Sequence, residues 1–418
     1  MAGHSHRADT SIDGAVRLGG AARSGLLGFL GLCLVATVVG LVVWWPPGGV
    51  TEHVADQAGQ GAQFAAPGVT FPVGTVESVG SPCTDGVPDG SGCGSLRVKV
   101  PAEDGAPART VEVQVSPDVL AAGLERGDRV ELVRTPHVEG GSDGASYAFF
   151  GIKRGGTLAW LAVVFAAVVL AVARWRGLFA LIGLAFGGAV VWWFLLPALF
   201  DGAPGVGVAL VSSSAIMMVV LYLTHGVSYR TSVALAGTLI GITLTALMGL
   251  VAIGHAHLTG ISDEAGAMLA SFDADLDFQS LLSCALVIAG LGVLNDVTIT
   301  QASAAWELRA LSPGATRAQV FASAMRIGRD HIASTIYTIV FAYVGTALVV
   351  LMLISIYDRP LLELLSTAQL AEEVVRTLVT SIGLVLAVPI TTAVAAVVAA
   401  PVPGAERPDE MPLPAHAH

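Results

Sequence analysis

Long apolar runs constrain this chain more than any other feature. A helix needs about 20 consecutive apolar residues to cross a hydrocarbon layer of about 30 Å. Charged residues make up only 13% of the 418 residues, whereas about 25% is usual in soluble proteins. The apolar runs lie at 26–45, 158–173, 178–196, 205–223, 232–253, 281–302, 332–354 and 378–398. The sequence therefore predicts a polytopic α-helical membrane protein with about eight transmembrane helices.

One sizeable stretch, residues 51–153, is hydrophilic and has the character of a small β domain. Its segments LRVKV and TVEVQV alternate apolar and polar residues, as strands with one buried face do. The segment SPDVLAAGLERGD carries the cap and turn signals of a short helix. We expect strands at 73–79, 96–100, 110–115, 129–134 and 147–152, with that helix between the third and the fourth. This order predicts an all-β, OB-like barrel.

The charge balance argues against nucleic acid as a partner. The chain has a formal net charge of −11, and residues 47–155 hold eight basic against fourteen acidic residues. Proteins that bind nucleic acid present a clustered basic surface. We expect the β domain to dock a partner or to gate instead.

The remaining segments complete the domain organisation. Residues 1–25 and 400–418 are predicted as disordered tails, 26–45 as an uncleaved first transmembrane helix, and 157–399 as a membrane domain of about seven helices. Eleven arginines fall in the tails and short loops on one side of the predicted membrane and two on the other. Because basic residues favour the cytoplasmic side, both termini are predicted to be cytoplasmic and residues 47–156 extracytoplasmic.

Two cysteines lie in this predicted outer segment. Cys83 and Cys93 flank the turn-rich sequence TDGVPDGSG, with no further metal ligand close by. In an oxidising compartment they are expected to form a disulfide.

Asp296 is an acid inside an apolar run. With Thr300, Ser303 and Glu307 it follows helical spacing, so these side chains share one helix face. A charge at the bilayer centre costs about 2.5–3.5 kcal/mol on insertion scales, so it needs a partner or a function. Asp296 is our candidate for proton or cation coupling. Neighbouring oxygen donors could assist it: Asn295, Thr298, Thr300, Ser303 and Glu307.

Two structural alternatives for Asp296 remain open. It could be neutralised by Arg326 or Arg329 of the following helix, or it could lie at the cytoplasmic interface. Asp330 and His331 stand beside those arginines, and a histidine there could relay protons near neutral pH.

Two glycines precede Asp296. Gly290 and Gly292 could unwind the helix and expose backbone carbonyls, as in the broken helices of transporters. Alternatively, they could let a neighbouring helix approach closely.

The loop at 254–277 is acidic and contains two histidines. Side chains of this loop could bind a divalent cation. The alternative is that the loop is only a solvent-exposed connection between two helices. The calcium-loop pattern fails, because Phe278 replaces the required glycine. The candidate donors are His255, His257, Asp273, Asp275 and Asp277. We expect no cofactor.

Three segments carry a resemblance to a known family. GLGVLNDVTITQASAAWEL, IGRDHIASTIYT and AYVG, in this order, resemble segments of the YibE/F family of bacterial membrane proteins. The likeness covers residues 177–399. It implies a multi-pass protein of the bacterial cell membrane and no particular chemistry. Gly292, Asn295 and Asp296 also show a shorter likeness to the SecD/SecF and RND-type permeases, in which such an acid couples protons.

These observations predict a permease rather than an enzyme. The chain has no P-loop, His-Glu-x-x-His or Gly-x-Ser-x-Gly motif. A permease driven by a proton or cation gradient, with an unknown solute, fits the acid within the membrane. The alternative is a non-transporting accessory protein whose outer domain docks a protein partner in envelope biogenesis or secretion. Both place the chain in a lipid bilayer, and both are compatible with a homo-oligomer.

Overall fold

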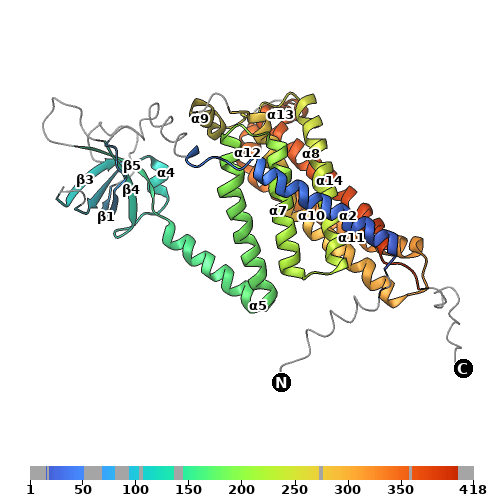
Figure 1. The fold of residues 1–418 in the computed structure, drawn as a ribbon. Helices are drawn as coiled ribbons and strands as arrows, with labels where there is room; N and C mark the ends of the chain where they lie inside the picture. The colour runs from blue at the N-terminus through green and yellow to red at the C-terminus, as the bar shows by residue number, and fades with distance from the viewer. Residues whose placement is uncertain are drawn as a thin grey trace, which may run out of the picture. The chain divides into compact units, whose positions relative to one another are not determined.

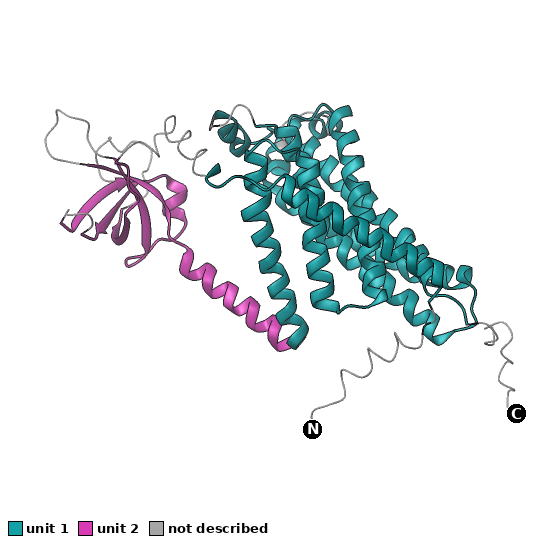
Figure 2. Cartoon of the chain, viewed as in Figure 1, with its two compact units in different colours: residues 1–51, 173–418 teal, residues 52–172 magenta. Residues whose placement is uncertain are grey.

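A computed structural model describes most of the chain. The described residues are 16, 18–50, 68–80, 94–102, 107–135, 145–272, 276–356 and 360–402. The chain divides into two compact units (Figure 2), one formed by residues 1–51 and 173–418 and the other by residues 52–172.

The second unit contains a five-stranded antiparallel sheet. Its strand order is β3-β2-β1-β4-β5, and the short helix α4 (Pro117–Ala121) lies between β3 and β4 along the chain (Figure 1). The strands are β1 (Val73–Val79), β2 (Ser95–Val100), β3 (Arg109–Gln114), β4 (Arg129–Thr135) and β5 (Ser146–Ile152). The predicted strands and helix are confirmed, each boundary lying within a few residues of the expected one.

Alternation along the strands builds the core of this unit. In β2, Leu96, Val98 and Val100 are buried, whereas Arg97 and Lys99 point to solvent.

The sheet curls into half of a barrel, and no ladder joins its edge strands β3 and β5 within the described residues. A closed OB-like barrel is therefore not confirmed.

Helices make up almost all of the other unit. They are α2 (Gly20–Val43), α5 (Gly155–Val190), the π-helical turn η1 (Val191–Leu195), α6 (Leu196–Phe200), α7 (Gly205–His225), α8 (Tyr229–His255), α9 (Glu264–Phe272), α10 (Phe278–Leu311), α11 (Arg317–Thr346), α12 (Leu348–Ile356), α13 (Leu361–Leu365) and α14 (Ala368–Val398). Helix α5 begins in the β-containing unit and ends in this one.

Six helices within the described residues are long and apolar enough to cross a membrane, not the eight predicted. One cause of the difference is the 46-residue helical stretch Gly155–Phe200, which contains two of the predicted runs. Its path breaks at Arg174, whose backbone is non-helical with φ 54° and ψ −128°. The two predicted runs are therefore two helical segments joined at this break, although together they count as one candidate span.

The second cause lies in the predicted span 332–354. Helix α11 starts with charged residues and ends at Thr346, so its apolar part is short. The most apolar residues of that run belong to the separate nine-residue helix α12. The turn at Ala347 divides the two, and neither helix alone reaches the hydropathy and length of a span.

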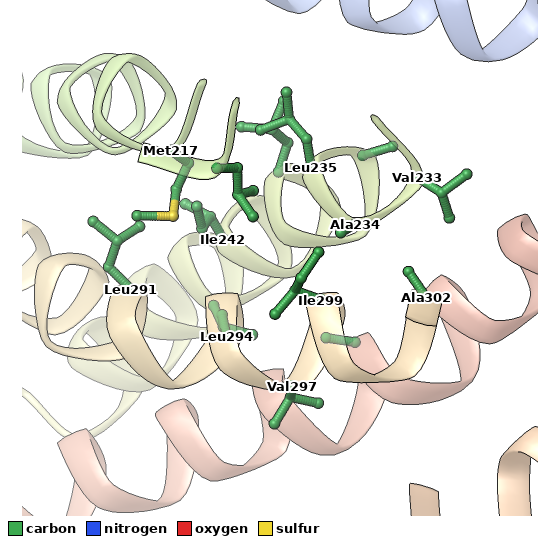
Figure 3. Close-up of a cluster of buried hydrophobic side chains, with 14 of the residues drawn as sticks. Met217, Val233, Ala234, Leu235, Ile242, Leu291, Leu294, Val297, Ile299 and Ala302 are labelled. Carbon is green, nitrogen blue, oxygen red and sulfur yellow. The ribbon is translucent and has the colours of Figure 1, made fainter. Parts of the chain in front are cut away.

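The centre of this unit is the packing of α8, α10 and α14. Figure 3 shows Met217 of α7 reaching toward Leu291 of α10, with Ile242 of α8 beside them. Between α8 and α14 the backbones come close at Gly237, where a Cβ atom would overlap the hydroxyl and the Cβ of Thr391. Small residues allow such close approach between helices in a membrane.

A pair of buried hydroxyls also connects α8 to α10. The Oγ1 atoms of Thr238 and Thr298 lie 2.6 Å apart, and both residues are fully buried. Since each hydroxyl has a single proton, one of the two donates to the other, and the accepting hydroxyl donates to a carbonyl of its own helix, Thr238 to Ala234 or Thr298 to Asn295. These two hydroxyls are thus bound to protein rather than exposed to lipid.

Gly237→Ala is expected to destabilise the protein by about 1–3 kcal/mol, because the added methyl group overfills the α8–α14 contact. Gly292→Ala is the matched control, since a Cβ atom added there would meet no other atom within 4 Å and alanine favours a helix. Thermal unfolding of the detergent-solubilised variants measures the difference. Equal melting temperatures for the two variants would contradict the close packing at Gly237.

Candidate functional site

Asp296 and His331 come together across α10 and α11. The His331 Nε2 atom lies 3.8 Å from Asp296 Oδ2, with side-chain exposures of 33% and 66%. This separation allows an ion pair when the imidazole is protonated but is too long for a hydrogen bond. The Nε2 atom is itself enclosed and makes no hydrogen bond within the described part of the chain. A small side-chain movement would bring the two groups into direct contact.

The polar residues around Asp296 divide between two sides of α10. Asp296, Thr300 and Glu307 are exposed and Ser303 is half-buried, so the side that carries them is not packed against the bundle. Thr298 points inward to Thr238, and the Thr300 hydroxyl donates to the backbone carbonyl of Asp296. The oxygen donors suggested by the sequence are therefore not gathered around one point.

Asn295 is half-buried and has an enclosed side-chain oxygen. Its Oδ1 atom has no hydrogen-bond partner among the described residues. Asn295 directly precedes Asp296, so an amide and a carboxylate side chain follow one another along α10.

The arginines of α11 do not pair with Asp296. Arg326 donates to the hydroxyl of Ser323 at 2.8 Å, and Arg326, Arg329 and Asp330 are all exposed. In the described structure the basic side chain close to Asp296 is that of His331. The expected structural tie to an arginine is therefore replaced by contact with a histidine that follows these arginines along α11.

The two glycines before Asp296 do not break the helix. Helix α10 is continuous through Gly290 and Gly292. A Cβ atom on Gly290 would meet the Thr380 methyl group of α14 at 3.3 Å, whereas Gly292 faces open space. Gly290 therefore serves the close approach of α10 and α14 and exposes no carbonyls.

The donors of the 254–277 loop are dispersed where they are described. His255 is exposed and its Nδ1 atom lies 2.9 Å from the carbonyl oxygen of Val251, while His257 is exposed with φ 52°. Asp277 caps the N-terminus of α10 by accepting from the Ser280 N–H at 3.1 Å. No group of three or more His, Cys, Asp or Glu side chains within the described ranges could hold a metal ion. Asp273 and Asp275, like Cys83 and Cys93, lie outside the described residues.

Arg309 is a buried cation that sequence analysis did not single out. Its side chain is 1% exposed at the end of α10, and its Nε atom donates to the carbonyl of Ala399 after α14 at 3.0 Å. One terminal nitrogen donates to the carbonyls of Pro313 and Ala315. The C-terminal ends of helices carry partial negative charge, which suits a guanidinium there. Arg309 thus holds α14 and the α10–α11 connection to α10.

A cavity of about 410 Å³ near the opposite end of α10 was also missed. It lies between the loop before α9, the first turns of α10 and α14, and the junction of α11 with α12. Its charged lining residues are Asp263, Glu372, Glu373 and Arg376. The segment Glu372-Glu373-x-x-Arg376, at the start of the last apolar helix, was the available sequence signal.

A comparison with known families decides the class of this protein. Residues 161–401, more than half of the chain, match the family model described as YibE/F-like protein. The chain belongs to the YibE/F-like family. No curated protein and no solved structure matches it. With its six candidate spans, this YibE/F-like chain is a multi-pass membrane protein.

The N-cap of α10 makes the stability of this YibE/F-like protein dependent on pH. Hydrogen bonds from Ser280, first from its hydroxyl and then from its backbone N–H, hold the pKa of Asp277 below its ordinary value. A lowered pKa in the folded state stabilises the protein above the unfolded-state pKa of about 3.9. That contribution is lost as the pH falls through the lower folded-state pKa.

Asp277→Ala is expected to cost about 1 kcal/mol at neutral pH, as loss of an N-cap usually does, and Asp277→Asn less. Melting temperatures of the solubilised protein at pH 7 and at pH 3 measure both effects. The deficit of Asp277→Ala should shrink at pH 3, while Glu307→Ala, at an exposed position on the same helix, serves as the control. A deficit that stays constant with pH would contradict the role of the ionised cap.

Proposed function

We propose that this membrane protein is a permease driven by a proton or cation gradient, in which Asp296 and His331 form the coupling pair. The observation that carries this proposal is the 3.8 Å approach of the two side chains across α10 and α11. A protonated imidazole would attract the carboxylate across the two helices, whereas a neutral imidazole would not. Proton uptake would therefore change the attraction between the two helices.

The position of the pair along α10 supports this role. Asp296 lies 18 residues after Phe278, which corresponds to about 27 Å along a helix axis. The hydrocarbon core is about 30 Å thick, so a helix that enters at Phe278 carries Asp296 toward the far side of the core. At that depth Asp296 is close to the far interface, where the pair could exchange a proton with water.

The proposal includes eight membrane crossings with both termini in the cytoplasm. The stretch Gly155–Phe200 is 46 residues long, or about 69 Å as a helix, which is enough for two crossings separated by the break at Arg174. Helices α11 and α12 together supply another crossing. The end of the bundle near Arg309 and Arg317 would then face the cytoplasm, in accord with the distribution of basic residues.

In proteoliposomes with an imposed membrane potential, the wild type is expected to show a proton flux that Asp296→Asn reduces at least tenfold. His331→Gln should reduce it as well, because both members of the pair are required. Glu307→Gln removes the same charge from the same exposed side of α10 and should leave the flux unchanged. A pH-sensitive dye inside the vesicles measures the flux.

The outcome that would remove Asp296 from the coupling role is equal flux in the wild type and Asp296→Asn, with both proteins folded. A flux abolished equally by Glu307→Gln would point to a general charge effect instead. Circular dichroism and size-exclusion profiles of each variant exclude misfolding as the cause.

The second candidate function is that of an accessory protein that docks a partner through its β unit. The observation that favours it is that residues 52–172 form a compact unit of their own, with a core built from Val76, Leu96, Val98 and Leu132 among others. We also propose that this sheet belongs to an OB-like barrel, because its strand order and the position of α4 fit that fold.

Deletion of residues 73–152 separates the two functions in cells that depend on this protein. The accessory function predicts that the deletion abolishes growth or secretion while Asp296→Asn has no effect. The permease function predicts that Asp296→Asn abolishes growth or secretion. Membrane levels of both variants, measured by immunoblotting, provide the control.

A further inference from the structure

The cavity near the N-terminal ends of α10 and α14 is built from both polar and apolar parts. Its volume of about 410 Å³ lies within the range of small-molecule sites. Leu269, Phe278, Leu281 and Leu282 supply apolar surface. Ser262 and the charged groups of α14 supply the polar side. Small-molecule sites usually combine an apolar lining with a few fixed polar groups in this way.

Glu372 is the buried charge in this lining. The residue is 6% exposed, and its Oε2 atom accepts a hydrogen bond from the Ser262 hydroxyl at 2.7 Å. Its Oε1 atom is enclosed and has no hydrogen-bond partner among the described residues. Buried carboxylates are normally paired with a cation. One oxygen of this carboxylate in the cavity wall therefore has no partner within the described structure.

The neighbouring arginine is already bound to another residue. Arg376 pairs with Glu373 through Nη1 and Oε1 at 2.8 Å, and the ion pairs found in the described structure include none to Glu372. Asp263 accepts from the backbone N–H of Gly266 at 2.7 Å. With three carboxylates and one guanidinium, the lining is net negative. This charge favours a cationic ligand.

The cavity suits an organic cation better than a bare metal ion. No three His, Cys, Asp or Glu side chains in the described ranges are grouped closely enough to hold a metal. An alkylammonium ion could instead donate to Glu372 and cover the leucines with its hydrocarbon part. A site of this size would also leave most of its volume empty around a single ion.

We propose that this cavity binds a small organic cation, with its ammonium group against the carboxylate of Glu372 and its apolar part against Leu281 and Leu282. Glu372 is the residue that determines the charge of the ligand, and Ser262 positions it. This inference goes beyond the proposed function, since binding requires neither transport nor a proton at Asp296. Failure of the flux experiment would therefore leave it standing.

Isothermal titration calorimetry of the full chain in detergent, with n-butylammonium chloride as the probe, tests the proposal. The wild type should bind the probe saturably, and 1-butanol, which has the same alkyl chain without the charge, should give no saturable heat. Glu372→Gln keeps the shape of the side chain and should weaken binding at least tenfold, as loss of a buried charge partner does. Sodium chloride at equal concentration controls for ionic strength.

Two further variants keep the test decisive. Glu363→Gln removes an exposed carboxylate of α13 that does not line the cavity, and its affinity should match the wild type. Ala285→Phe fills the cavity from an exposed position on α10 and should also weaken binding, even if Glu372→Gln fails to fold. Equal affinity of Ala285→Phe and wild type, saturable binding of 1-butanol, or no binding of butylammonium by the wild type would overturn the proposal.

Discussion

Close contact between the backbones of α8, α10 and α14 is the constraint on which the helical unit depends. Lipid tails are as apolar as leucine side chains, so burial of apolar surface does not by itself bring helices together in a membrane. Association must come from tight packing and from hydrogen bonds between helices. Gly237 and Gly290 provide the first by allowing α14 to approach α8 and α10, and Thr238 with Thr298 provides the second. The side of α10 that faces this contact is fixed as a result.

Because one side of α10 packs against α8 and α14, the residues on its opposite side are left outside this contact. Residues that face α8 and α14, such as Leu294 and Thr298, are fully buried, so Asp296 two residues from each is turned outward. Helix α11 approaches that outer side. Gln301 of α10 donates to the carbonyl of Ala324 in α11 at 2.8 Å, and His331 reaches Asp296. The Asp296–His331 pair is therefore a consequence of helix packing that leaves one polar stripe accessible to α11.

Local patterns were enough to predict much of this protein. Alternation of Leu96, Val98 and Val100 with charged residues placed β2 correctly, and helical spacing placed Asp296, Thr300, Ser303 and Glu307 along one side of α10. Contacts between distant segments could not be predicted in this way. Glu372 meets Ser262 across 110 positions, and Arg309 meets Ala399 across 90, and neither pair carries a local signal. The number of helices long enough to span a membrane could not be predicted from hydropathy either, because hydropathy does not reveal a break such as the turn at Ala347.

Helix α11 relates the two candidate sites physically. His331 lies in its middle, and its last residue, Thr346, together with Ala347 lines the cavity that contains Glu372. The distance from His331 to Thr346 is 15 residues, or about 22 Å along the helix. Both helices pack closely on α14 at a glycine, α10 at Gly290 and α11 at Gly328. A proton at His331 that strengthened its attraction to Asp296 would act on α11, and any displacement of α11 would reach the cavity at Thr346. Coupling through this helix requires that α11 has two discrete positions. Protonation of the Asp296–His331 pair and binding in the cavity must each shift the equilibrium between these two positions, because only then are the two sites linked.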